Sequence, residues 1–254
     1  MKKLSAGTRV IILIGCCGAL AIFSSTISKS PILAIFAKEL GATTAQAGII
    51  ASMSTIPGIL ISYIAGDLSD RFGYKKIMIA SLVVFSSAPL IYQLVSSPWQ
   101  LGAVRFYHGF ATAAFNPVAM AAIAAFSGKN TGQNLSIYSS VTMVGRALAP
   151  TVGGAAYDLG GYRTVYVIAV VAGTSALLLA LWFFGRSKKD MEQAISKKND
   201  GEAEKLSFFR KLWSLLTYRP LLFASALNAT MYFGYGAFEM VFPLYAKDII
   251  SRPA

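Results

Sequence analysis

Long apolar blocks separated by short polar links make up most of the chain. A helix that crosses a bilayer needs about 20 mainly apolar residues, and seven blocks reach that length. Gly and Pro occur inside several blocks, which membrane helices tolerate when neighbouring helices satisfy the freed backbone groups. The pattern predicts an all-α fold, a polytopic membrane helix bundle. The approximate bounds of the seven predicted spans are 10–36, 45–65, 77–96, 101–126, 135–157, 164–185 and 221–246.

One long polar link divides the bundle after the sixth span. Its first half carries charges of mixed sign, and its second half places Phe208 and Leu212 among Arg210 and Lys211, the pattern of a helix that lies in the membrane interface. We therefore expect three parts. These are a six-helix bundle over 1–185, a cytoplasmic linker with an interfacial amphipathic helix over 186–219, and a seventh membrane helix over 220–254 that begins a second half.

The composition excludes a soluble domain and a disordered chain. Of the 254 residues, 55% are hydrophobic and only 13% are charged, whereas an average globular protein has about 25% charged residues. The mean hydropathy is +0.57. Cys16 and Cys17 are adjacent inside the first span, so they are not expected to bridge each other.

The net charge of +12 raises the question of a nucleic-acid partner, and the placement of the charges answers it. Sixteen of the 23 Lys and Arg residues fall on the links that share a side with the N-terminus, four fall on the other side and three fall inside spans. Positive residues accumulate on the cytoplasmic side of membrane proteins. We therefore predict a multi-pass protein of the cell membrane (inner or plasma membrane) with a cytoplasmic N-terminus, and no nucleic-acid partner.

The sequence offers no enzyme chemistry. It has one histidine, no cluster of metal-ligand residues, and no G-x-x-x-x-G-K-[ST] loop of the kind that binds nucleotide phosphates. We expect no enzymatic activity, no catalytic residue, no metal and no cofactor.

The link between spans two and three carries the most specific motif, Gly66-Asp67-Leu68-Ser69-Asp70-Arg71-Phe72-Gly73-Tyr74-Lys75-Lys76. A glycine can adopt a backbone conformation in such a tight turn that other residues resist. The segment resembles the signature loop of the major facilitator superfamily, G-x-L-x-D-R-x-G-R-K, with Tyr74 at the first basic position of the final pair. The resemblance implies a conformational-switch motif formed by Gly66, Leu68, Asp70, Arg71, Gly73, Lys75 and Lys76.

Two further elements follow in the order of that superfamily. Arg105 and Gly109 in span four match an R-x-x-x-G element, and span five contains a segment similar to the G-x-x-x-G-P-x-x-G-G element of the superfamily's drug:proton antiporters. Ala149 replaces the second glycine of that element, which keeps the helix surface small. The helix-packing residues that the resemblance implies are Gly145, Pro150, Gly153 and Gly154.

The resemblance implies a secondary transporter that works by alternating access and exports small drug-like or metabolite molecules, with the proton gradient as its energy source. Its partners are then the small-molecule substrate, protons and the lipid bilayer. A solute uptake symporter of the same superfamily stays open as an alternative. Because the superfamily plan has twelve spans and seven are present, a truncated, non-transporting fragment, or a half that needs a partner supplying the missing C-terminal half, is a further alternative.

Ionisable residues inside spans are candidates for function because burying them near the bilayer centre costs at least ~2.5–3.5 kcal/mol. Lys29 and Glu239 are expected in the outer third of the bilayer, either as a pair across a central cavity or with Lys29 reaching to the interface. By its motif position, Arg105 resembles the family residue tied to proton coupling. His108 lies three residues further along, as a titrating group or as a histidine hydrogen-bonded to a neighbour. Arg146 is expected to pack against polar groups or to face the cavity.

Overall fold

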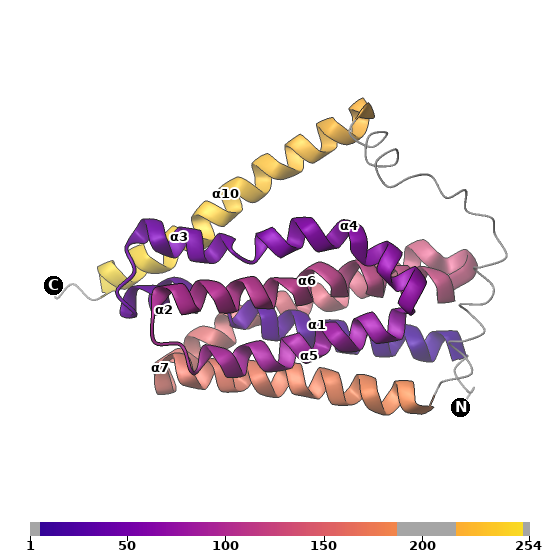
Figure 1. The fold of residues 1–254 in the computed structure, drawn as a ribbon, viewed down its shortest axis with the longest axis horizontal. Coiled ribbons are helices and arrows are strands. Elements are labelled where there is room, and N and C mark those ends of the chain that lie inside the picture. Colours follow the sequence, from indigo (N-terminus) through magenta and orange to yellow (C-terminus); the bar gives the residue numbers. More distant parts are fainter. Residues whose placement is uncertain (1–5, 187–216, 251–254) are drawn as a thin grey trace. The chain divides into compact units, whose positions relative to one another are not determined.

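The computed structural model describes residues 6–186 and 217–250 of the chain, and within those ranges all regular structure is helical. It divides into two units, Met1–Ile195 and Ser196–Ala254, which we describe separately (Figure 1). The first unit contains α1 (Ala6–Ile27), α2 (Ile32–Glu39), α3 (Thr44–Ser52), α4 (Thr55–Phe72), α5 (Tyr74–Tyr92), α6 (Pro98–Ser127), a short 3-10 turn (Gly128–Asn130) and α7 (Thr131–Arg186). The second contains α10 (Arg219–Ile250).

Four helical stretches in the described residues are long and apolar enough to cross a membrane. They are Gly7–Glu39, Thr44–Ile61, Tyr74–Tyr92 and Pro98–Phe184. The last of them is 87 residues long and covers the predicted spans 101–126 and 135–157 and all but the final residue of 164–185. Helix α10 has 32 residues, enough to cross a bilayer, but it is not among the four stretches. The seventh span therefore stays a prediction, and the predicted interfacial helix lies mostly outside the described residues.

Each of the first two predicted spans is two helices and not one. Helix α1 ends at Ile27 and α2 begins at Ile32, while α3 ends at Ser52 and α4 begins at Thr55. A proline ring clashes with the carbonyl four residues before it and has no N–H to donate. Pro31 stands four residues after Ile27, and Pro57 stands four residues after Met53, so each proline lies where it interrupts its span.

Helix α7 contains two predicted spans joined by a pair of glycines. Gly160 and Gly161 have non-helical backbone angles, and Gly161 has φ +66°, in the left-handed region that favours glycine. The chain changes direction at this pair, between the predicted spans five and six.

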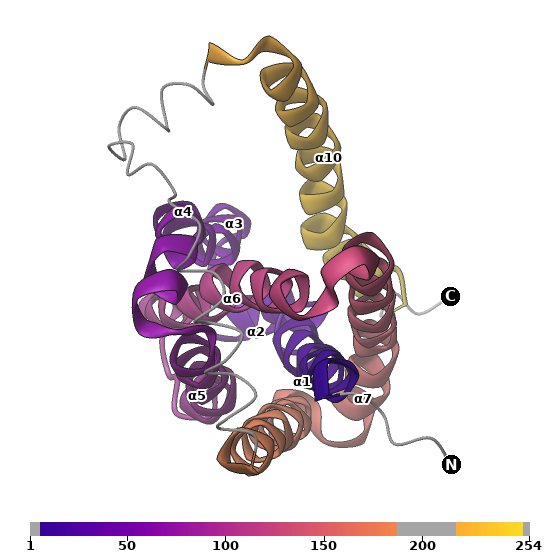
Figure 2. The same ribbon diagram turned by 90° about the vertical axis from the view of Figure 1, so that its right-hand side faces the viewer.

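The core of the first unit lies along α1 and α6, which Figure 2 shows in the middle of the unit with α4, α5 and α7 around them. Its main cluster of buried side chains includes Ile14, Phe85, Phe115 and Phe184. A second cluster, with Ile27, Ile32 and Val165, joins α1 and α2 to α7.

Candidate functional site

Arg105 lies in the first third of α6, seven residues after Pro98, and is buried, with 3% of its surface exposed. Its Nη2 atom donates to the hydroxyl of Ser54 at 2.7 Å and to the carbonyl of Ala51 at 3.4 Å. Both acceptors belong to the break between α3 and α4. Because the last carbonyls of a helix have no partner within it, this break supplies the oxygen atoms that hold a buried cation.

Gly109 lies one helical turn beyond Arg105 and touches the same break. A Cβ atom added to Gly109 would lie 2.5 Å from the carbonyl oxygen of Ser54 and 2.5 Å from Cγ of Pro57, closer than real contacts allow. The R-x-x-x-G spacing therefore places a hydrogen-bonding arginine and a residue without a side chain on one face of α6. Both residues contact the break between α3 and α4, which lies inside the predicted second span.

A cluster of aromatic rings surrounds the next polar residue of α6. His108 is 1% exposed, its Nδ1 atom lies 3.4 Å from the hydroxyl of Tyr92, and its ring meets Phe85 edge to face with centroids 5.6 Å apart. Tyr92 in turn stacks on Tyr166 at 4.8 Å. In the structure His108 is thus a buried histidine that is hydrogen-bonded to a neighbour, Tyr92. This geometry corresponds to the second of the two roles that the sequence left open for it.

Three buried polar atoms of this region have no hydrogen-bond partner among the described residues. They are Nε of Arg105, Nε2 of His108 and the hydroxyl of Tyr166. The partners that Arg105 does have there, a hydroxyl and a carbonyl, carry no charge. This part of the first unit therefore holds a buried positive charge.

The span-five element packs against α1 through residues spaced four apart. A Cβ added to Gly145 would lie 2.6 Å from the carbonyl oxygen of Ala19, and one added to Gly153 would lie 3.2 Å from Cγ1 of Ile27. Ala149, between them, is completely buried. The contact with α1 is therefore made by Gly145, Ala149 and Gly153, which we call the small-residue face of α7.

Two other residues of that element lie away from this contact. Pro150 is exposed, and a Cβ added to Gly154 would meet nothing within 4 Å. Arg146, beside Gly145, is also exposed on the first unit.

The signature loop joins α4 to α5 through Gly73, whose φ is +83°. The Gly73 N–H donates to the carbonyl of Ser69 at 2.9 Å, so the glycine closes the last turn of α4. Nζ of Lys75 donates to the carbonyl of Phe184 at 3.0 Å and so binds the loop to the last turns of α7, where a cation is favourable. Lys76 is exposed.

The other members of the predicted switch motif lie in the last two turns of α4, and for these four residues we describe only the helical backbone. These are Gly66, Leu68, Asp70 and Arg71.

Lys29 and Glu239 lie in different units. Lys29 is half-buried in the turn between α1 and α2, and its backbone N–H donates to the backbone carbonyl of Thr26 at 3.0 Å. Glu239 is half-buried in α10. Their pairing stays a prediction.

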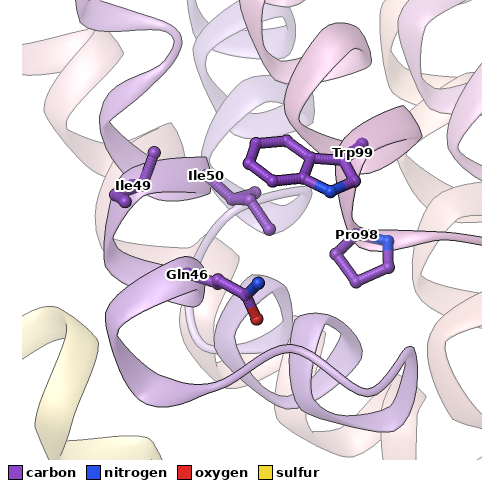
Figure 3. Close-up of a pocket in the computed structure, with 5 residues that line it drawn as sticks. All are labelled: Gln46, Ile49, Ile50, Pro98 and Trp99. Atoms are coloured by element: carbon purple, nitrogen blue, oxygen red, sulfur yellow. The ribbon is translucent and has the colours of Figure 1, made fainter.

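A small pocket lies where the start of α3 meets the start of α6 (Figure 3). Its volume is about 10 Å³, and it is lined by Gln46, Ile49, Ile50, Pro98 and Trp99. This is room for about one water molecule. We therefore do not assign a substrate to it.

Sequence reasoning missed the two helix breaks and with them the acceptors of Arg105. The signal was available in Pro31 and Pro57, but proline is common in membrane helices and does not by itself say whether a span bends or stops. The aromatic partners of His108 come from α5, and Tyr166, which stacks on Tyr92, comes from the second half of α7. No local pattern connects those segments to α6.

Together, the membrane-length apolar helices, the buried cation and the close contacts between small residues define a multi-pass helical membrane protein. The family model of the Major Facilitator Superfamily matches residues 14–250. The chain belongs to this superfamily, whose members are transporters rather than enzymes.

Curated relatives agree with the family. The "Multidrug resistance protein MdtG" of Escherichia fergusonii is 33% identical over 148 residues, which cover 56% of this chain and 36% of that protein. MdtG of Enterobacter lignolyticus is 31% identical over 150 residues, 57% of this chain and 36% of that protein. The "Uncharacterized MFS-type transporter MJ1560" of Methanocaldococcus jannaschii is 28% identical over 152 residues, 59% and 39% of the two chains. The matched part of the chain spans little more than a third of the length of these relatives.

Proposed function

We propose that the chain acts in a secondary transporter that exports small drug-like molecules in exchange for protons by alternating access. Its residues 1–185 form the N-terminal six-helix half, and the seventh helix begins the second half. The observation that carries the proposal is Arg105, a permanently charged and buried group of the first unit whose described hydrogen-bond partners are uncharged oxygens.

A cation in this position supplies the electrostatic part of proton coupling. Guanidinium stays protonated in proteins, and a nearby positive charge favours the deprotonated form of an acid. An acidic side chain that approaches Arg105 in one state of the transport cycle would release its proton, and it would bind a proton again when it moves away. Glu239 is the acid that we nominate, because predicted spans one to six contain no Asp or Glu.

The contact between α1 and α7 supports movement of the first unit as one body. At Gly145 the backbones of the two helices approach so closely that no side chain fits between them. The hydroxyl of Ser24 in α1 also donates to the carbonyl of Ala169 in α7 at 2.8 Å. Alternating access needs halves that rock without deforming, and close packing of small residues favours this.

The names of two relatives support export over uptake, since both are called multidrug resistance proteins. The small-residue face of α7 lies in the segment that resembles the antiporter element and supports the same direction. A solute symporter and a chain that does not transport by itself are the alternatives that the experiment must separate.

The test is a transport assay in inverted membrane vesicles from cells that express the chain, energised by respiration. The probe is ethidium, a lipophilic cation with a fluorescence readout. We expect ethidium to accumulate inside the vesicles, to leave on addition of a protonophore, and to fail to accumulate with Arg105→Lys. Lysine keeps the charge but loses the planar set of donors. Arg163→Gln, on the exposed link between spans five and six, is the matched control and should transport normally.

Each other result contradicts the proposal in a different way. Proton-dependent accumulation in right-side-out vesicles only would indicate an uptake symporter. No ethidium movement in either orientation would indicate that the chain does not transport this class of substrate by itself. Transport that is unaffected by Arg105→Lys would remove Arg105 from the coupling mechanism.

A further inference from the structure

A groove lies between the beginning of α1 and the end of α7, at one end of the first unit. Its volume is about 360 Å³, within the range of about 300–1,000 Å³ that is usual for ligand sites. Leu13 and Phe183 form part of its apolar wall, and Trp182 and Arg9 stand at its edge as exposed side chains. Figure 1 shows that the start of α1 and the end of α7 lie at the same end of the unit.

The chemistry of the groove changes from charged to apolar along α1. Arg9 lies in the first turns of that helix, and Ile12 and Cys16, which also line the groove, follow on the same helix face one and two turns further into the predicted membrane. A second cation stands close by, because Lys75 binds the carbonyl of Phe184, the residue after the groove's Phe183. The groove thus has a positive end and an apolar interior.

The orientation predicted from the charge distribution places the positive end at the cytoplasmic surface. The cytoplasmic leaflet carries the anionic lipids, and one Lys or Arg near that surface contributes about 1 kcal/mol to their attraction. Tryptophan favours the same depth, where its ring meets the lipid headgroups. The charged headgroup and the acyl chain of one lipid match these two parts of the groove.

We propose that this groove is a binding site for an anionic phospholipid of the cytoplasmic leaflet. The phosphate group binds Arg9, and one acyl chain lies along Ile12, Cys16 and Leu179. The site is independent of the proposed transport activity. It would hold the first and sixth spans together at the end where the signature loop binds α7 through Lys75.

The small pocket of Figure 3 provides an internal comparison. It also contains an exposed tryptophan, Trp99, but its other lining residues, Gln46, Ile49, Ile50 and Pro98, include no cation. Its volume of about 10 Å³ leaves no room for an acyl chain. Lipids in contact with Trp99 should therefore exchange without preference for headgroup charge.

The experiment uses quenching of tryptophan fluorescence by brominated lipids, with the full chain reconstituted in vesicles. A variant that keeps Trp182 as its only tryptophan carries Trp99→Phe and Trp213→Phe, and the matched control keeps only Trp99. Each is placed in phosphatidylcholine vesicles that contain a fixed fraction of brominated phosphatidylglycerol or brominated phosphatidylcholine. The comparison of the two quenchers gives the relative affinity of the lipid site beside each tryptophan.

We expect Trp182 to prefer phosphatidylglycerol about fivefold at low salt, and Trp99 to show no preference. Arg9→Gln should abolish the preference at Trp182. Cys16→Phe should fill the groove and reduce quenching by both lipids without a change of charge.

Three results would overturn the lipid site. The first is equal quenching of Trp182 by the two lipids in the unsubstituted groove, which would mean that no selective site exists. The second is a preference that survives Arg9→Gln. The third is a Trp182 that neither lipid quenches, which would mean that the groove is not open to lipid. None of these results depends on whether ethidium is transported.

Discussion

Replacing Gly109 by alanine tests whether α6 must lie directly on the break between α3 and α4. The added Cβ would lie 2.5 Å from the carbonyl oxygen and 2.9 Å from Cα of Ser54, and both are backbone atoms that cannot rotate away. Overpacking of this kind costs about 1–3 kcal/mol. Alanine in place of glycine inside a helix offsets about 0.5–1 kcal/mol of that cost.

The hydrogen bond of Arg105 adds to the expected loss. If α6 moves away from the break, the 2.7 Å contact between Nη2 of Arg105 and the Ser54 hydroxyl lengthens, and a hydrogen bond to a charged group contributes about 1.5–3 kcal/mol. We therefore expect Gly109→Ala to destabilise the protein by about 2–4 kcal/mol.

Gly102→Ala on the same helix is the matched control. Its added Cβ would meet only side-chain atoms of Ile50 and Met53, each at 3.8 Å, which is ordinary van der Waals contact. This variant should be as stable as the unsubstituted protein, or more stable by about 0.5–1 kcal/mol.

The measurement is the midpoint of thermal unfolding in detergent for both variants. Unfolding is monitored by the reaction of Cys17 with a fluorogenic maleimide. Cys17 is buried, and Cys16, which is exposed, is first replaced by serine so that it does not contribute. The midpoint should fall by several degrees for Gly109→Ala and stay or rise for Gly102→Ala. An unchanged midpoint for Gly109→Ala, or an equal fall for both variants, would refute the close contact on which the site is built.

Three further predictions follow from the same structure. Gly145→Ala should destabilise the protein by about 1–3 kcal/mol, because the added Cβ meets the backbone of α1. Gly154→Ala should not, because its added Cβ meets nothing within 4 Å. Equal thermal midpoints for the two variants would contradict the small-residue face of α7. Lys75→Met should lower the midpoint by removing the 3.0 Å hydrogen bond to the carbonyl of Phe184. The effect should be about 1 kcal/mol, smaller than for the buried Arg105 because Lys75 is only half-buried. The exposed Lys76→Met should not lower the midpoint, and a larger effect at Lys76 would count against this contact. Lys29→Glu and Glu239→Lys should each impair ethidium transport while the double reversal restores it, and a double variant as impaired as the singles would exclude the pairing.

Much of the fold followed from local patterns. Apolar length predicted the helices and their approximate order, and the positive φ of Gly73 and Gly161 matches turns that the sequence placed between spans. Arg105 and Gly145 lie in α6 and α7, within the predicted spans four and five.

The partners of those residues did not follow from the sequence. The length of an apolar block predicts that a segment can cross a bilayer. It does not predict a local break in the helix, such as the one between Ser52 and Thr55. Ala51 and Ser54 lie about 50 residues before Arg105, and nothing in their own surroundings marks them as acceptors. The groove beside Arg9 likewise forms only where the start of α1 meets the end of α7.

The sequence by itself determined that this protein is a helical membrane protein and which residues carry the superfamily motifs. The side that faces the cytoplasm stays a prediction from the charge distribution. It could do so because burial in lipid, local backbone geometry and charge placement act on neighbouring residues along the chain. Only the tertiary structure decided what each motif residue touches. A buried guanidinium and a glycine without a side chain take their roles from backbone atoms on other helices, and those distances exist only after the helices have packed.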